Sequence, residues 1–138
     1  MHLNWIGVTA ALATFFGIWF GHVAVRKIEF VAPNVWLPAL ISWAGGIGLE
    51  AASFAVDSRA VSASLGILGV TLLWDGLEFW RQEKRVKEGH APANPHNPRH
   101  ARILAQYPAA TTFDWLDRVP IGRRLSPEEL EAIREAAP

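Results

Sequence analysis

The chain has 138 residues, of which 51% are hydrophobic and 19% are charged, and its formal net charge is zero. This length leaves room for one small domain, and the balanced charge argues against a nucleic-acid-binding surface. The chain contains no cysteine, which excludes disulfides, thiolate metal sites and thiol redox chemistry.

The charged residues are concentrated in the C-terminal part of the chain. Residues 81–138 hold ten of the 13 Lys and Arg residues and eight of the 13 Asp and Glu residues. Residues 1–80 are therefore predominantly apolar. This division predicts a membrane domain that is followed by a water-exposed tail.

Residues 3–25 form the first predicted membrane span. They contain no Asp, Glu, Lys or Arg, and as a helix they are long enough to cross about 30 Å of hydrocarbon. The segment is longer than the apolar core of a secretory signal peptide and no Lys or Arg precedes it, so we expect a retained helix. Small residues at every fourth position predict a face for close helix packing; they are Ala13, Gly17 and Gly21.

A short connection follows the first span. Arg26 and Lys27 end the span, and residues 28–34 include Pro33, which resists helix continuation. We expect these residues to form a tight connection at the membrane surface. Glu29 is expected to pair locally with Arg26 or Lys27.

Residues 36–56 and 60–80 predict a second and a third span. The link between them is the minimal turn at residues 57–59, which suits two antiparallel helices. The third helix continues beyond its span into a charged segment that ends at Gly89. Small residues on these two helices extend the expected packing faces; they are Gly48, Ala52, Ser62 and Gly66.

The expected fold is therefore an all-α membrane protein. Residues 1–89 form a three-helix transmembrane domain, whose third helix extends into the cytoplasm, and residues 90–138 form a tail. Residues 90–100 contain three prolines and predict an irregular segment, and residues 102–106 predict a helical turn. Residues 126–129 read Ser-Pro-Glu-Glu, a capping box that predicts a final helix over 127–136.

The basic residues predict the orientation of the chain in the membrane. Arg26 and Lys27 follow the first span, and a second basic cluster within residues 81–87 follows the third. Both clusters lie on one side of a three-span protein, and the positive-inside rule places that side in the cytoplasm. The N-terminus is then outside and the C-terminal third is cytoplasmic.

Four ionisable side chains lie within the predicted spans or at their ends, and they are His22, Glu50, Asp75 and Glu78. A charge at the centre of a bilayer costs on the order of 3 kcal/mol, so such residues are candidates for a proton relay, an ion path or a ligand site. The structural alternative is that His22 hydrogen-bonds a carboxylate and joins two helices, while Glu78 pairs with Arg81 or Gln82. Both interpretations stay open.

Other chemistry has little support in the sequence. The chain has no phosphate-binding loop, nucleophile elbow or helical pair of zinc-binding histidines. His90, His96 and His100 match no structural-zinc spacing. We therefore expect no enzymatic activity, no bound metal and no cofactor in this chain alone.

The apolar residues of the tail are too few for an independent core. We expect some of them to dock on a partner subunit, and the best candidates are Phe113, Trp115 and Leu116.

A pattern of residues crosses the end of the third helix and the segment after it: Trp74, Glu78, Gln82, Lys84, Arg85, Val86, Gly89, Pro92, Asn94 and Pro95. This pattern resembles the signature of the domain-of-unknown-function 4491 family of small bacterial membrane proteins, over roughly residues 3–97. The resemblance implies three spans in a bacterial inner (plasma) membrane, and it brings no established activity. It draws attention to His22, Glu29 and Glu78. Glu50 and Asp75 depart from the family pattern.

These observations lead to two hypotheses on function. In the first, the protein is an accessory or anchoring subunit of a larger membrane complex, such as an energy-converting or redox complex, and its tail docks on a partner. Its partners are then membrane lipids and other subunits, and not nucleic acid. In the second, the chain is a small oligomeric transporter that moves ions through its intramembrane histidine and carboxylates.

Overall fold

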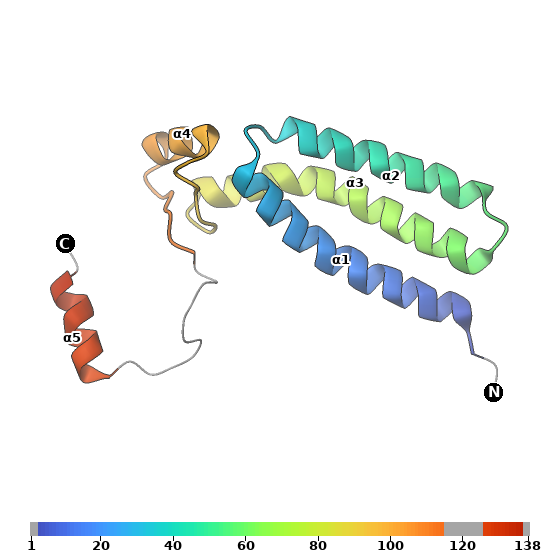
Figure 1. Ribbon diagram of the computed structural model, residues 1–138, viewed down its shortest axis with the longest axis horizontal. Helices are drawn as coiled ribbons and strands as arrows, with labels where there is room; N and C mark the ends of the chain where they lie inside the picture. The colour runs from blue at the N-terminus through green and yellow to red at the C-terminus, as the bar shows by residue number, and fades with distance from the viewer. Residues whose placement is uncertain (1–2, 115–125, 137–138) are drawn as a thin grey trace.

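The computed structural model describes residues 3–114 and 126–136. Figure 1 shows three long helices that lie side by side, followed by two short ones. The long helices are α1 (Trp5–Val31), α2 (Trp36–Ala55) and α3 (Arg59–Lys87), and the short helices are α4 (Pro98–Gln106) and α5 (Pro127–Ala136). The described residues contain no strand, and all three long helices are apolar and long enough to cross a membrane. The predicted fold class is confirmed.

Helix α3 is the central element of the transmembrane domain. It packs along both α1 and α2 (Figure 1). Between α1 and α3 the contact is close because small residues face the neighbouring helix. A Cβ atom added to Gly17 would lie 3.2 Å from Leu68, and one added to Gly21 would collide with the carboxylate of Asp75. Ala13 is buried on the same helix.

The contact between α2 and α3 combines small residues with two side-chain hydrogen bonds. A Cβ atom on Gly46 would lie 2.8 Å from the backbone oxygen of Gly69, so the two backbones nearly touch. The Trp43 indole donates to the Leu73 carbonyl at 3.1 Å. The Ser62 hydroxyl donates to the Ser53 carbonyl at 2.8 Å. Donors on both helices therefore bond to backbone carbonyls of the facing helix.

One residue of the predicted packing face does not lie at this contact. A Cβ atom on Gly48 would meet no other atom within 4 Å, so Gly48 does not contact a neighbouring helix within this chain, and its role in helix packing stays a prediction. Gly46 makes the contact with α3, because it lies on the side of α2 that faces α3. Ala52 is half-buried, and a Cβ atom added to Gly66 would lie 3.8 Å from the carboxylate of Glu50.

Helix α1 is longer than the predicted span. It continues past Arg26 and Lys27 to Val31, where Ala32 takes an extended conformation. Ala32 precedes Pro33, and a proline disfavours the helical conformation of the residue before it. The basic pair therefore marks the end of the apolar segment, and the proline determines where the helix ends.

Gly89 ends α3 as predicted, in a Schellman motif. Its φ of +73° lies in the left-handed region that favours glycine. The Gly89 N–H donates to the Val86 carbonyl, and the His90 N–H donates to the Arg85 carbonyl. This pair of bonds turns the chain back along α3.

The segment after Gly89 is more ordered than the sequence suggests. The predicted helical turn over 102–106 is part of α4, which begins at Pro98 because the Asn97 side chain caps its first turn. A small core joins this helix to the end of α3, and it consists of Val86, Ala91, Ala93 and Ile103, with Leu104 and Ala110 against it. Residues 81–114, which follow the spans, are called the head segment below.

The last helix follows its predicted capping box. The Glu129 N–H donates to the Ser126 hydroxyl at 3.2 Å, and the Ser126 N–H donates to the Glu129 carboxylate at 2.8 Å. Helix α5 covers the predicted range, Pro127–Ala136.

Candidate functional site at the junction of helix α1 and the head segment

A buried ion cluster joins the end of α1 to α4. The Glu29 carboxylate accepts from the Arg99 guanidinium at 2.8 Å and from the His100 ring at 2.9 Å. Only 1% of the Glu29 side chain and none of the His100 side chain is exposed. The predicted local pairing of Glu29 with Arg26 or Lys27 is wrong, because Glu29 lies on the face of α1 that the head segment covers.

The hydrogen bonds around His100 determine which of its ring nitrogens carries the proton. Its Nδ1 accepts the Asn94 backbone N–H at 2.9 Å, so we assign the ring proton to Nε2. Nε2 then donates to Glu29 at 2.9 Å, and the Arg99 guanidinium lies 3.0 Å from the same nitrogen. This arrangement satisfies both ring nitrogens of a fully buried histidine. His100 is therefore a structural link between the loop at Asn94 and α1.

Arg99 connects three parts of the molecule. Besides Glu29, its guanidinium donates to the Glu83 carboxylate on α3 at 2.8 Å and to the backbone carbonyl of Glu29 at 2.7 Å. Glu83 also accepts from Lys87. One arginine of α4 thereby ties α1 to the extension of α3.

Glu83 lies beyond the apolar part of α3, and its pKa reflects these partners. Burial by itself would raise the pKa of the Glu83 carboxyl. The hydrogen bonds and charges of Lys87 and Arg99 outweigh burial and hold that pKa below its ordinary value. The carboxylate is thus stabilised in its charged form.

Two asparagine side chains cap the C-terminal end of α1. The last carbonyls of a helix have no partner within the helix and need donors from elsewhere. The Asn94 amide donates to the Phe30 carbonyl at 3.2 Å, and the Asn97 amide donates to the carbonyls of Phe30 and Ala32 at 3.1 and 2.9 Å. Residues of the head segment therefore complete α1.

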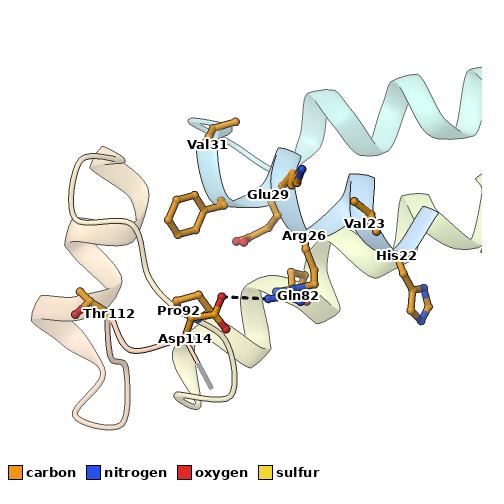
Figure 2. Close-up of a pocket in the computed structure, with 11 residues that line it drawn as sticks. His22, Val23, Arg26, Glu29, Val31, Gln82, Pro92, Thr112 and Asp114 are labelled. Carbon is orange, nitrogen blue, oxygen red and sulfur yellow. Dashed lines mark hydrogen bonds and ion pairs between the residues drawn. The ribbon is translucent and has the colours of Figure 1, made fainter. Parts of the chain in front are cut away.

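A cavity of about 840 Å³ lies beside this cluster. Figure 2 shows its walls: the end of α1 on one side, and Pro92, Thr112 and Asp114 of the head segment on the other. The lining residues are His22, Val23, Arg26, Lys27, Glu29, Phe30, Val31, Gln82, Pro92, Thr112 and Asp114. The cavity thus combines apolar walls with basic residues at the end of a helix that is long and apolar enough to cross a membrane.

Arg26 and Asp114 form an ion pair across this cavity. Their nitrogen and oxygen lie 3.5 Å apart, and both side chains are partly exposed (Figure 2). The long distance and the exposure make this a weak contact.

The intramembrane candidates fall into two separate places. Glu78 accepts from Arg81 at 2.9 Å and from Arg85 at 3.1 Å, so the predicted pairing of Glu78 with Arg81 is present. Asp75 is buried against Gly21, at the same end of the domain. Glu50 lies farther along the α2–α3 contact, against Gly69, and its Oε1 is buried without a hydrogen-bond partner among the described residues.

Within the described residues, His22 does not form the hydrogen bond to a carboxylate that the structural alternative proposed. It is exposed and points away from Arg26 in Figure 2. It lies close enough to Asp75 for an electrostatic interaction, and with Glu78 and Arg85 it lines a second, smaller cavity. His22, Asp75 and Glu78 are therefore neighbours, although the structure shows no bond from His22 to a carboxylate in the described residues.

The remaining predicted site residues differ in their exposure, and two of them lie outside the described residues. Phe113 is 53% exposed, whereas Trp115 and Leu116 lie outside the described residues. His90 and His96 are exposed while His100 is buried. The described part of the chain contains no group of three His, Cys, Asp or Glu side chains that could hold a metal ion.

Sequence reasoning missed the partners of Glu29. Arg99 and His100 come from a segment whose prolines predict an irregular conformation. Asn97, which caps the end of α1, comes from the same segment. One signal was available, since Asn97-Pro98 combines a preferred helix cap with a proline at the first helical position. The pairing with Glu29 had no local signal, because about 70 residues separate the partners.

Comparison with known proteins identifies one match. Residues 4–97 match the family DUF4491, described as a domain of unknown function. The matched range includes Glu29, Glu83, Asn94 and Asn97, and it ends before Arg99 and His100. No curated protein and no solved structure matches the chain.

Proposed function

The chain belongs to the DUF4491 family, and from that premise we propose that it is a non-catalytic accessory or anchoring subunit of a larger membrane complex. Its three apolar helices make it a small membrane protein. The spans hold the subunit in the bilayer, and the tail after the head segment docks on a partner.

The observation that carries this proposal is the buried cluster of Glu29, Arg99 and His100. Buried charges are costly unless they are fully paired, and where they are retained they can specify one arrangement of the elements that they join. Here they hold the head segment against α1. A tail that begins from a fixed head segment has a defined position for docking on a partner.

The exposed surfaces agree with a subunit role. Phe113 is exposed at the end of the head segment, and most residues in the apolar windows of α1 and α2 are not buried inside the chain. The remaining apolar surface of these helices is available to lipid or to other transmembrane helices.

Transport receives less support from the geometry. The Glu78 carboxylate is neutralised by Arg81 and Arg85, and Glu50 lies apart from Asp75 and Glu78 along the helices. A proton path needs polar groups in succession, and Leu73, which packs against Gly46, lies on α3 between the Gly69 contact of Glu50 and the carboxylates of Asp75 and Glu78.

The orientation is part of the proposal. We place the protein in a bacterial plasma membrane, with the N-terminus outside and the head segment and tail in the cytoplasm. The support is that Arg26, which is followed by Lys27, lines the same small cavity as Arg85 of α3.

The test is purification of the full chain from its native membranes in a mild detergent. Wild type is compared with a variant that ends after Asp114 and with Phe113→Ser in the full chain. We expect one membrane protein to elute with wild type at a fixed ratio and to be lost from the truncated variant. A wild-type chain that elutes alone, or a partner that the truncated chain retains in full, would contradict the proposed docking.

A further inference from the structure

The cavity beside Arg26 has the chemistry of a lipid headgroup site. We propose that it binds the phosphate group of one anionic phospholipid, whose acyl chains run along the outer face of α1. This site goes beyond the proposed subunit role and requires no partner protein.

The position of the cavity supports a ligand that is polar at one end and apolar at the other. Arg26 and Lys27 lie where the apolar segment of α1 ends, which is the depth of lipid headgroups. Val23, Phe30 and Val31 supply apolar walls next to these cations. A volume of about 840 Å³ is large enough for a phosphate headgroup and the glycerol that follows it.

The charges that line the cavity favour an anion. Glu29 lines the cavity, and its carboxylate is already paired with Arg99 and His100. Asp114 offsets Arg26. Lys27 is exposed and, within the described residues, has no carboxylate partner, so the lining has one uncompensated positive charge. A basic residue at the membrane surface attracts anionic lipid.

The outer face of α1 continues the site toward the bilayer. Phe16, Trp19, Phe20 and Val23 recur at helical spacing on this face and are all exposed. The acyl chains of a lipid in the cavity would lie along these side chains. One continuous surface of α1 would therefore contact both the headgroup and the acyl chains.

The lipid phosphate would replace Asp114 as the partner of Arg26. The present ion pair is 3.5 Å long and partly exposed, and a phosphate can accept two shorter charge-assisted hydrogen bonds from one guanidinium. Asp114 and the lipid phosphate therefore compete for the same side chain. Removing the Asp114 charge should strengthen lipid binding, and this gain cannot arise from misfolding.

The experiment measures lipid retention by native mass spectrometry. The full chain in detergent is mixed with equal amounts of phosphatidylglycerol and phosphatidylcholine, and the lipid that stays bound to each chain is counted. A parallel sample contains sn-glycerol 3-phosphate as a soluble competitor. The variants are the double substitution Arg26→Gln/Lys27→Gln, the single substitution Asp114→Asn, and Lys84→Gln as the matched control, because Lys84 is exposed on α3 and does not line the cavity.

We expect wild type and Lys84→Gln to retain one phosphatidylglycerol in preference to phosphatidylcholine. The double variant should lose about tenfold or more in retention, on the order of fivefold for each basic residue, and Asp114→Asn should retain severalfold more than wild type. Equal retention of the two lipids by wild type would overturn the proposal. So would unchanged retention in the double variant, a loss in Asp114→Asn, or displacement of the lipid by an equal concentration of glycerol phosphate.

Discussion

Glu29 and Arg99 form a buried ion pair of 2.8 Å, although 70 residues separate them in the sequence. Glu29 belongs to the first membrane helix, and Arg99 belongs to the short helix of the head segment. The pair therefore fixes the position of the head segment relative to the membrane domain, and the first prediction tests it.

Replacing Arg99 with Gln should loosen the head segment. Removing one partner of a buried pair leaves the other charge uncompensated and costs about 3–5 kcal/mol. Hydrogen exchange of residues 91–106 in detergent should become faster in Arg99→Gln and in Glu29→Gln. Arg102→Gln is the control, because Arg102 is exposed on the same helix. Unchanged exchange in both test variants would show that the pair does not hold the head segment.

Substitutions at two neighbouring glycines of α2 should have opposite effects. Gly46→Ala places a methyl group 2.8 Å from the Gly69 carbonyl oxygen, so α2 must move away from α3 at a cost of about 1–3 kcal/mol. Gly48→Ala fills open space and removes a helix-weakening glycine, so stability should stay equal or rise. Thermal unfolding in detergent measures both. An equal loss of stability in the two variants would contradict the observed α2–α3 contact.

Acid should weaken the attachment of the head segment through Glu83. The pKa of this carboxyl is lower in the folded chain than its ordinary value of 4.5, so folding is favoured while the carboxylate is charged. That contribution is present above pH 4.5 and is lost as the pH falls through the lowered folded pKa.

The measurement is the melting temperature between neutral pH and pH 3, compared for wild type and Glu83→Gln. The wild type should lose more stability on acidification than the variant, which has no carboxyl at this position to protonate. If both curves fall in parallel, the ion pairs of Glu83 with Lys87 and Arg99 do not contribute to stability.

The proposed orientation can be tested with single cysteines, because the chain has none of its own. Ser58→Cys lies in the exposed turn between α2 and α3, and Ala105→Cys lies exposed on α4. In right-side-out membrane vesicles, a membrane-impermeant maleimide should label Ser58→Cys at once. It should label Ala105→Cys only after the vesicles are opened. The reverse order of labelling would invert the proposed topology.

Local patterns in the sequence predicted those parts of the fold that depend on neighbouring residues. The capping box at Ser126 predicted α5 at its observed bounds, and Gly89 ends α3 because a left-handed residue is needed there. The end of α1 was placed too early, because the basic pair that marks the membrane boundary does not stop a helix. The deciding residue is Pro33, which acts through its effect on Ala32.

For the candidate site, the sequence indicated which charged side chains lie in apolar helices. It did not indicate which residues these side chains contact in the folded chain. Glu50, Asp75 and Glu78 were recognised because charges are rare in apolar helices. Their partners depend on which faces of α2 and α3 are in contact. In the folded chain, Glu50 lies against Gly69, whereas Glu78 pairs with Arg81 farther along α3. Gly48 was assigned to the packing face by its spacing, whereas the rotation of α2 in the domain places Gly46 there.

The sequence by itself determined the all-α fold class and the three helices that are long and apolar enough to cross a membrane. It could do so because helix length, apolar composition and end signals act over a few residues. The tertiary structure alone decided that Glu29 is enclosed by Arg99 and His100, and that a cavity lies between α1 and the head segment. The physical reason is that a buried charge is stabilised by whichever partners the folded chain brings within hydrogen-bonding distance. These partners come from a segment about 70 residues away, and no local pattern in the sequence records that approach.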